Sequence, residues 1–312
     1  MGNEPKSELT VRAVLSKQGL ANSEIKQGAQ RGKIWLRGVP TSDLGRLVSP
    51  EDVTYMPEAP RLMPGRDLAV LFRDDDLAVV WKPSGWLSVR APGRGDERDL
   101  VSYVGNLFGQ SFVVHRLDEE TSGVMMVALN ERMQFEIKRL LENHDIERRY
   151  LALVKGHPTD THWTKETTFI RNRGDGLRGS GHGEGAKRAF TQFELVEKLQ
   201  GGVSLVQATL ETGRTHQVRI HLAESGHPVL GDRLYGDNRS SRKCPRVALH
   251  AAVLGLKHPR TGEKLSFDIP LADDLEQLRR SHMPNRHSGR EVERRGRPPK
   301  KKARKPRSKK RR

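Results

Sequence analysis

Residues 114–123 (VHRLDEETSG) form a short segment in which seven of the ten side chains could take part in chemistry. The segment places His, Arg, Asp, two Glu, Thr and Ser between two apolar runs, and connections on a rigid scaffold are favoured places for active sites. Its carboxylate Asp118 could serve catalysis, or it could simply cap the turn by accepting backbone hydrogen bonds. Composition alone leaves these two interpretations equal.

A second segment with many functional side chains covers residues 211–236 (ETGRTHQVRIHLAESGHPVLGDRLYG). Thr215 has the side chain of an N-cap, and Gly226 and Pro228 are typical of a helix end and of the chain just beyond it. A strand over THQVRIH is the alternative, but Gly226 and Pro228 favour a helix from Thr215 to Glu224.

On that helix Arg219 shares a face with Thr215 and Leu222. An arginine on this face would keep a nearby carboxylate ionised and would fix its rotamer. The alternative is an ordinary surface arginine.

Several other kinds of site are excluded by missing patterns. The chain has 12 His, but no HExxH or HxxEH, and its single Cys244 offers no thiolate cluster, so we predict no metal. No GxSxG elbow occurs, and no GxGxxG follows a strand, so we expect neither a serine hydrolase nor a dinucleotide cofactor. Residues 171–185 are rich in Gly but lack GxxxxGK[ST], which predicts a flexible loop rather than a phosphate-binding one.

Apolar patterns predict the elements that must position these segments. Strands are expected at residues 77–81, 112–114, 124–129, 150–154, 204–211 and 265–269. Residues 131–143 predict a helix with Met133, Ile137, Leu140 and Leu141 on one face. Strands outnumber helices, and several follow one another without a crossover helix. The sequence therefore predicts an α+β fold with a mixed, largely antiparallel sheet.

The N-terminal region predicts a small α+β unit of its own. A first helix carries Val11, Val14 and Leu15 on one face, and a second is expected to begin with Asn22 or Ser23 as its N-cap. A short strand is expected at residues 33–37, and the stretch 47–55 is expected to end with another short strand. We place this unit at residues 1–55, a proline-rich linker at 56–66, and the main body at 67–280.

The remaining residues, 281–312, predict a disordered basic tail. The chain has a net charge of +17, and residues 290–312 alone hold 14 Lys and Arg against two Glu, a net charge of +12. Such a segment has too little apolar surface to fold. Its charge indicates an anchor for a polyanion such as nucleic acid, with a solubilising extension as the alternative.

The sequence also indicates a protein of the cytoplasm. It has no run of 18 apolar residues and no apolar stretch typical of a signal peptide near its N-terminus. Lys6 stands where a myristoylation signal has Ser or Thr. The single cysteine excludes an internal disulfide, so we do not expect an oxidising compartment. From the missing apolar runs we expect no membrane span.

The two functional segments together resemble the signature motifs of the RluA-type pseudouridine synthases. The matching phrases are HRLDEETSGVMMVA and GRTHQVRIHLAESGHPVLGDRLYG. Four others agree in order, namely LAVVWKPSGWLSV, ERRYLALVKGHP, AKRAFTQFELVE and ALHAAVLGLKHPRTGEKLSFDIP. The resemblance covers roughly residues 67–275 and is highly specific as a set. It departs only slightly, with Met125 and Met126 in place of commoner aliphatic residues.

This resemblance implies conversion of uridine to pseudouridine in RNA without a metal or cofactor. The family pattern implies that Asp118 is the catalytic carboxylate and that Arg219 pairs with it. Tyr150 would lie against the target base and assist proton removal, and Arg116 would fill the gap left by the flipped nucleotide.

Lys82 and Arg214 are further candidates for RNA contacts, with plain surface solvation as the alternative for both. Flipping a base out of its stack costs a few kcal/mol, and stacking on an aromatic ring returns about 1–3 kcal/mol per base. A ring and several cations around one carboxylate are therefore what such an enzyme needs.

Residues 15–53 of the N-terminal unit resemble a ribosomal-protein-S-four-like RNA-binding domain. The resemblance rests on GLANSE followed by GKIWLRG, and it departs from the usual pattern at Trp35 and Leu36. With the basic tail, this unit favours a large structured substrate, so we predict large-subunit ribosomal RNA, with transfer RNA as the alternative. We expect the enzyme to act as a monomer.

A non-catalytic RNA-binding or ribosome-assembly protein is the competing hypothesis. Such a protein would keep the body of a synthase but lose its catalytic side chains. The presence of Asp118, Tyr150 and Arg219 in this chain argues against it.

Overall fold

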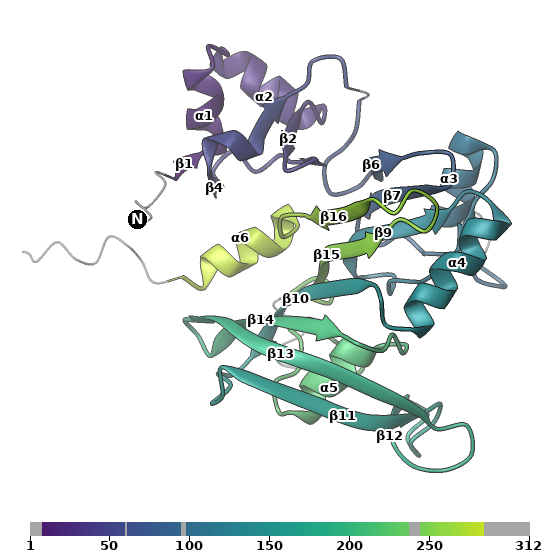
Figure 1. Ribbon diagram of the computed structural model, residues 1–312. Helices are drawn as coiled ribbons and strands as arrows, with labels where there is room; N and C mark the ends of the chain where they lie inside the picture. The colour runs from purple at the N-terminus through teal and green to yellow at the C-terminus, as the bar shows by residue number, and fades with distance from the viewer. Residues whose placement is uncertain (1–7, 60, 95–97, 237–243, 284–312) are drawn as a thin grey trace, which may run out of the picture.

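The computed structural model describes residues 8–59, 61–94, 98–236 and 244–283. Within these residues the chain forms a small N-terminal unit and a larger body built on one long sheet (Figure 1). The predicted basic tail lies outside the described residues from position 284 onward.

The N-terminal unit has its own apolar core. Its helices are α1 (Val11–Lys17) and α2 (Asn22–Gln30), with strands β1 (Leu9–Thr10), β2 (Ile34–Leu36), β3 (Val39–Pro40), β4 (Leu47–Val48) and β5 (Val53–Tyr55), and a 3₁₀ turn η1 (Pro50–Asp52). Val11, Val14 and Leu15 are buried as expected. The predicted N-cap of α2 is wrong by one position. Ala21 precedes the helix, and its N–H donates to the Glu24 carboxylate at 2.8 Å.

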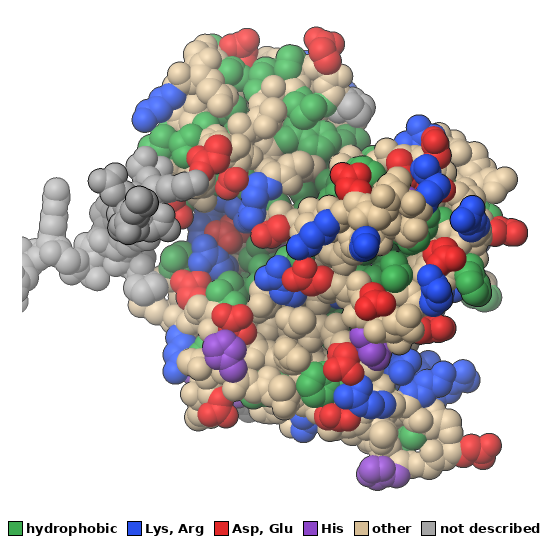
Figure 2. Space-filling model, viewed as in Figure 1, with side chains coloured by type: hydrophobic (Ala, Val, Ile, Leu, Met, Phe, Trp, Pro, Cys, Tyr) green, Lys and Arg blue, Asp and Glu red, His purple; other side chains and the backbone are tan. Residues whose placement is uncertain are grey.

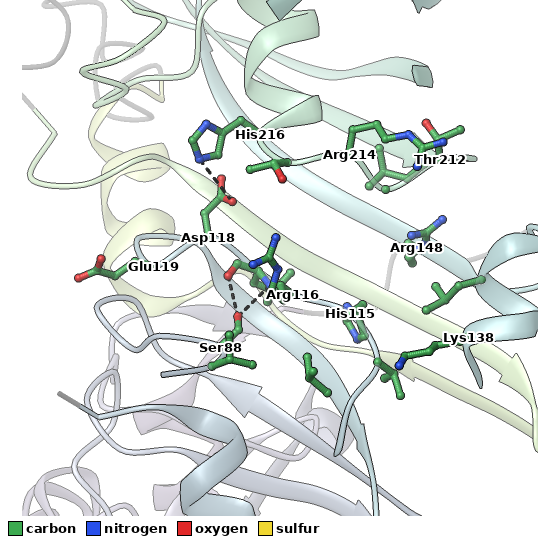
Figure 3. A pocket seen from close by; sticks show the side chains of 18 of the residues that line it. Ser88, His115, Arg116, Asp118, Glu119, Lys138, Arg148, Thr212, Arg214 and His216 are labelled. Atoms are coloured by element: carbon green, nitrogen blue, oxygen red, sulfur yellow. Dashed lines mark hydrogen bonds and ion pairs between the residues drawn. The ribbon is translucent and has the colours of Figure 1, made fainter. Parts of the chain in front are cut away.

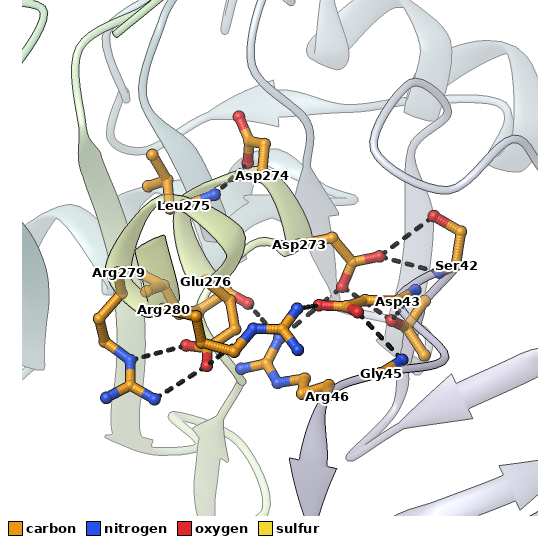
Figure 4. A network of polar contacts seen from close by, with 12 residues as sticks. Ser42, Asp43, Gly45, Arg46, Asp273, Asp274, Leu275, Glu276, Arg279 and Arg280 are labelled. Atoms are coloured by element: carbon orange, nitrogen blue, oxygen red, sulfur yellow. Dashed lines mark hydrogen bonds and ion pairs between the residues drawn. The ribbon is translucent and has the colours of Figure 1, made fainter. Parts of the chain in front are cut away.

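A polar network holds the N-terminal unit against the last helix, α6 (Asp273–Ser281) (Figure 4). Asp273 accepts hydrogen bonds from Thr41 Oγ1 at 2.7 Å and from the Ser42 N–H at 2.8 Å. The buried Arg46 guanidinium lies 3.7 Å from the same carboxylate. Burial raises the pKa of Asp273 even though these hydrogen bonds oppose the rise. Directional contacts of this kind fix the orientation of the unit on the body.

The body is a mixed, largely antiparallel sheet, as predicted. Its strand order is β12-β11-β13-β14-β10-β15-β9-β7-β6, with β16 beside β15 and β8 beside β9. Among the described pairs only β9 and β15 run parallel. The strands are β6 (Ala69–Arg73), β7 (Leu77–Lys82), β8 (Phe112–Val113), β9 (Ser122–Ala128), β10 (Glu147–Lys155), β11 (His162–Ile170), β12 (Gly179–Ser180), β13 (Lys187–Leu199), β14 (Val203–Leu210), β15 (Leu249–Lys257) and β16 (Lys264–Asp268).

Helices cover parts of this sheet. They are α3 (Leu100–Phe108), α4 (Glu131–Glu142) and α5 (Gln217–Glu224), together with α6. Asn130 caps α4 by accepting the Met133 N–H at 2.8 Å, and Met133 and Ile137 are buried beside β9, as their spacing predicts. In the described part of the chain no helix is long and apolar enough to cross a membrane.

Gly123 permits the close approach of the two parallel strands near the candidate site. Its φ is +130°, and a Cβ at this position would lie 2.2 Å from the carbonyl oxygen of Ala251, its partner in β15. Only glycine therefore fits here, because both the conformation and the space exclude a side chain. The loop that carries Asp118 is thus fixed at its end to the middle of the sheet.

Candidate active site

A cavity of about 1050 Å³ opens beside β10, which lies in the middle of the strand order. It is large for a ligand pocket, a class that spans roughly 300–1,000 Å³. Its walls are the loops before α3, β9 and α5, the end of α4 and the start of β10. The side chains that carry charge or a ring and line it are Arg90, His115, Arg116, Asp118, Glu119, Lys138, Glu142, His144, Arg148, Tyr150, Arg188, Arg214 and His216.

Asp118 and Arg219 meet at this cavity, although 101 positions separate them. Arg219 Nη1 donates to Asp118 Oδ2 at 3.0 Å, and its Nε and Nη2 donate to both oxygens of Asp232 at 2.7 and 2.9 Å. The Arg219 residue is 5% exposed and Asp232 is 1% exposed, whereas the Asp118 side chain is 24% exposed. One guanidinium therefore joins an accessible carboxylate to a buried one.

Asp232 is a residue of this site that the sequence did not single out. It lies within the GDRLYG phrase of the second motif, but nothing in that phrase indicates where its carboxylate points. Burial alone would raise the pKa of Asp232, and the hydrogen bonds and charge of Arg219 outweigh this, so its pKa is lowered. The pKa of Arg219 is raised because the two carboxylates more than offset the effect of burial.

Replacing Asp232 by Asn should lower stability at neutral pH by about 3–5 kcal/mol, because one partner of a buried pair is lost. Its pKa in the folded protein lies below the value of about 3.9 in an unfolded chain. Ionised Asp232 therefore stabilises the fold above about pH 4, and this contribution is lost as the pH falls through the folded pKa. Denaturant titrations between pH 3 and 7 should show a shallower loss of stability at low pH in D232N.

Asp160→Asn is the matched control, because Asp160 is exposed. It should follow the wild-type curve throughout. If D232N loses stability at low pH as steeply as the wild type does, the assignment of Asp232 as the buried partner of Arg219 is contradicted.

Tyr150 lines the cavity from β10, where it pairs with Ala208 of β14 and Ala251 of β15. Burial raises the pKa of Tyr150 to about 12, with Asp118 adding to the rise and Arg148 opposing it. The phenol therefore stays protonated near neutral pH. Both expected roles of Tyr150 at the target base stay predictions.

Helix α5 begins at Gln217, so the prediction that Thr215 caps it is wrong. His216 takes the position before the helix in a left-handed conformation, with φ 60° and ψ 17°. The Gln217 side-chain oxygen accepts hydrogen bonds from Thr212 Oγ1 at 2.8 Å and the Arg214 N–H at 2.9 Å. These contacts fold the loop back and delay the first helical turn.

His216 is a second residue that the sequence did not single out. Its Nε2 lies 3.8 Å from Asp118 Oδ1, and its Nδ1 shares a hydrogen bond with the Tyr235 hydroxyl at 2.9 Å. Burial lowers the pKa of His216, with Arg219 adding to the decrease and Asp118 opposing it. The imidazole is therefore neutral near pH 7.

Lys82 does not contact RNA in the way the sequence suggests. It is fully buried at the end of β7, and its ammonium donates to the carbonyls of Pro83 at 3.1 Å, Trp86 at 2.8 Å and Glu119 at 3.1 Å. Burial lowers its pKa to about 7, with Asp118 opposing. A buried ammonium with three carbonyl partners fixes the loop beyond Asp118 and cannot reach a phosphate.

Arg116 and Arg214 lie in the cavity wall and are exposed. Arg214 Nε donates to the carbonyl of Arg188 at 2.9 Å, which directs its side chain along the cavity. Figure 2 shows Lys and Arg side chains gathered at the right-hand edge, between the lower end of α4 and the ends of β13 and β11. Because Arg116 and Arg214 are exposed in the cavity wall, their predicted contact with RNA stays a prediction.

One group of described side chains has the spacing of metal ligands, but it lies outside this cavity. It consists of Asp74, Asp76 and His258. Asp76 forms an ion pair with Arg260 and accepts a hydrogen bond from Asn130 at 3.0 Å. His258 Nε2 lies 3.0 Å from Asp74 Oδ2. Protein groups already satisfy these carboxylates, so the group carries no argument for a metal.

Comparison with known proteins identifies the family. Residues 76–224 match the RNA pseudouridylate synthase family. The chain is 37% identical, over 205 residues, to the dual-specificity RNA pseudouridine synthase RluA of Escherichia coli O6:H1, covering 65% of this chain and 93% of that protein. The chain belongs to the RluA-type pseudouridine synthases. It is therefore an isomerase that acts on RNA.

Two further relatives extend this finding. The RluA-type chain is 32% identical to the uncharacterized RNA pseudouridine synthase YlyB of Bacillus subtilis, over 88% of this chain and 94% of that protein. Its fold is similar to the solved structure of human RNA pseudouridylate synthase domain containing 1, with a TM-score of 0.55 and 30% identity over 67% of this chain and 86% of that one.

Proposed function

We propose that this protein isomerises specific uridines of large-subunit ribosomal RNA, acting as a monomer in the cytoplasm with Asp118 as its catalytic carboxylate. The observation that carries the assignment is the Asp118 carboxylate at the cavity, held at 3.0 Å by a guanidinium that a second, buried carboxylate fixes from behind. A carboxylate that is oriented in a cavity is what attack at a ribose or a base requires.

The reaction moves one bond and one proton. The bond between C1′ and N1 of uridine breaks, the uracil turns in the cavity, and C5 bonds to C1′. The proton on C5 is then released, and N1 gains one, so the product is an isomer. Arg219 holds the Asp118 carboxylate in position through the hydrogen bond from its Nη1.

The target nucleotide must leave the RNA stack to reach Asp118. Unstacking costs a few kcal/mol, and Tyr150 can return about 1–3 kcal/mol by stacking with the base. Arg116 is exposed on the same cavity wall, where its planar guanidinium can replace the lost base in the RNA. Arg214 adds a second cation for the RNA backbone.

The substrate assignment rests on the parts of the chain outside the cavity. We propose an RNA-binding N-terminal unit at residues 1–55, joined by residues 56–66 to the catalytic domain at 67–280. The match to YlyB over 88% of this chain has to include part of that unit. Transfer RNA is the second candidate substrate.

Ribosomal and transfer RNA from cells that lack the protein can decide between the two substrates. Each fraction is incubated separately with the purified full-length protein, and pseudouridine is mapped by chemical modification and primer stops. We expect new sites in the large-subunit ribosomal RNA. Sites found only in transfer RNA would overturn the proposed substrate without affecting the reaction assigned to Asp118.

Deletion of residues 290–312 should weaken RNA binding and flatten its salt dependence. The segment holds 14 Lys and Arg. Each phosphate that these cations neutralise contributes about 0.9 to the slope of log K against log salt on a duplex. Filter binding at several salt concentrations measures the slope, and mapping checks the site. The modified uridine should stay the same, and an unchanged slope would contradict the anchoring role.

A further inference from the structure

Four arginines are buried in the described part of the chain, and one of them differs from the others. Arg46 lies 3.7 Å from Asp273, Arg219 lies 2.7 Å from Asp232, and Arg246 lies 2.6 Å from Asp274. The fourth, Arg148, has no carboxylate within 4.0 Å among the described residues. The rule in this protein is that a buried guanidinium has a carboxylate partner, and Arg148 breaks it.

Arg148 faces the active-site cavity from β10, two positions before Tyr150. Alternate residues of a strand point to the same face, so the two side chains lie side by side. Arg148 is 7% exposed, and its one hydrogen bond runs from Nη2 to the Glu211 carbonyl at 2.8 Å. Its Nε is buried without a partner.

The surroundings make room for this guanidinium without neutralising it. A Cβ at Gly213 would lie 2.7 Å from Arg148 Nη1, so the glycine of the GRTH phrase leaves the space that the guanidinium uses. Two titratable side chains that interact with it, Tyr150 and His115, do not supply a negative charge. Tyr150 is a protonated phenol, and burial lowers the pKa of His115 to about 3, so its imidazole is neutral.

The hydrogen bond to Glu211 does not explain the burial. The same carbonyl also shares a hydrogen bond with His144 Nδ1 at 2.8 Å, so it keeps a partner without Arg148. Burial of a charge without an opposite charge costs several kcal/mol. Such a cost is retained where a ligand supplies the missing anion, as at sites that trade stability for function.

We propose that Arg148 is the binding position for an RNA phosphate next to the target nucleotide. The proposal rests on the proposed function. In Figure 3 Asp118 and His216 lie at one end of the cavity, while Arg148 lies at the other end, near Lys138 and across from Arg214. A uridine that enters to reach Asp118 brings its phosphates along this wall. Nη1 has no acceptor among the described residues, which leaves a donor for a phosphodiester.

Thermal unfolding of Arg148→Met separates this role from a structural one. Methionine is apolar and unbranched, so it fills much of the same space and removes the unpaired charge. We expect the melting temperature of R148M to equal or exceed that of the wild type. A clear decrease would show that Arg148 supports the fold and would overturn the proposal. Arg132→Met, on the exposed face of α4 and outside the cavity, is the matched control.

Substrate analogues with one uncharged linkage test the phosphate directly. The probe is an oligoribonucleotide around a mapped uridine, taken from whichever RNA the wild type modifies, with single methylphosphonate linkages at each flanking position. For the normal oligonucleotide we expect R148M to lower kcat/KM by about tenfold to a hundredfold, the range for a hydrogen bond to a charged group. R148K should retain a large part of the activity, and R132M all of it.

The decisive result is whether the R148M substitution and one methylphosphonate linkage remove the same contact. At one linkage the methylphosphonate should slow the wild type strongly and leave R148M unaffected, because the lost partner is already missing. Equal slowing of both enzymes at every linkage would overturn the proposal. The activity of the wild type on the normal oligonucleotide tests the proposed reaction separately. If the ribosomal substrate is wrong, the oligonucleotide comes from another RNA, and the comparison between wild type and R148M is unaffected.

Discussion

Asp118→Asn should lower the rate of pseudouridine formation by on the order of 10⁴-fold, while RNA affinity stays nearly unchanged. Asparagine is almost the same size, and its side-chain oxygen still accepts the hydrogen bond from Arg219 Nη1, which lies 3.0 Å from the carboxylate. The substitution therefore removes the charge and the nucleophilic oxygen but keeps the geometry of the loop.

Release of tritium from C5 of labelled uridine measures the rate, and filter binding measures the affinity. Asp75→Asn is the control, because Asp75 is an exposed aspartate outside the cavity, and it should behave as wild type. Loss of activity with a matching loss of affinity would instead indicate that Asp118 acts in binding.

Arg219→Met should lower stability about as strongly as the loss of Asp232 and should also abolish activity. It leaves the buried Asp232 and the accessible Asp118 without their shared cation. Removing one partner of a buried pair costs about 3–5 kcal/mol. For a protein of this size each kcal/mol shifts the melting temperature by about 2–4 °C, so a decrease of roughly 6–20 °C is expected.

A double variant separates the two effects of this change. Arg219→Met with Asp232→Leu replaces the buried pair by apolar side chains, which restores stability in comparable cases. Calorimetry should show recovery of much of the lost melting temperature, whereas activity should stay absent, because Asp118 still lacks its cation. Recovery of both stability and activity would show that Arg219 acts only in folding.

Some strands with continuous apolar runs are predicted well, whereas β15 (Leu249–Lys257), which is also buried along most of its length, was not predicted. β7, β9 and the middle of β10 lie close to their predicted positions, because a strand buried on both faces needs such runs. β13 was not predicted, since its buried and exposed residues alternate irregularly across a bulge between Leu195 and Glu197. The start of α5 was misplaced because Gln217, rather than Thr215, makes the local hydrogen bonds.

The site residues show a second limit of prediction from the sequence. Asp118 and Arg219 were predicted from motifs, but Asp232 depends on where a turn directs one carboxylate, and local spacing does not encode this. The prediction that Lys82 lies at the surface was wrong, because a lysine is normally solvated. Only the three carbonyls around its ammonium explain why it is buried here. The unpaired charge of Arg148 likewise becomes visible only when the neighbours of all buried arginines are compared.

The most direct test of the central claim is a pseudouridine map of large-subunit ribosomal RNA from cells that lack the protein and carry either the wild-type or the D118N gene. The two proteins are expressed at equal levels, and the sites are read by chemical modification and primer stops. We expect the wild type to restore specific pseudouridines and D118N to restore none. Equal restoration by both would contradict the assignment of Asp118 as the catalytic residue.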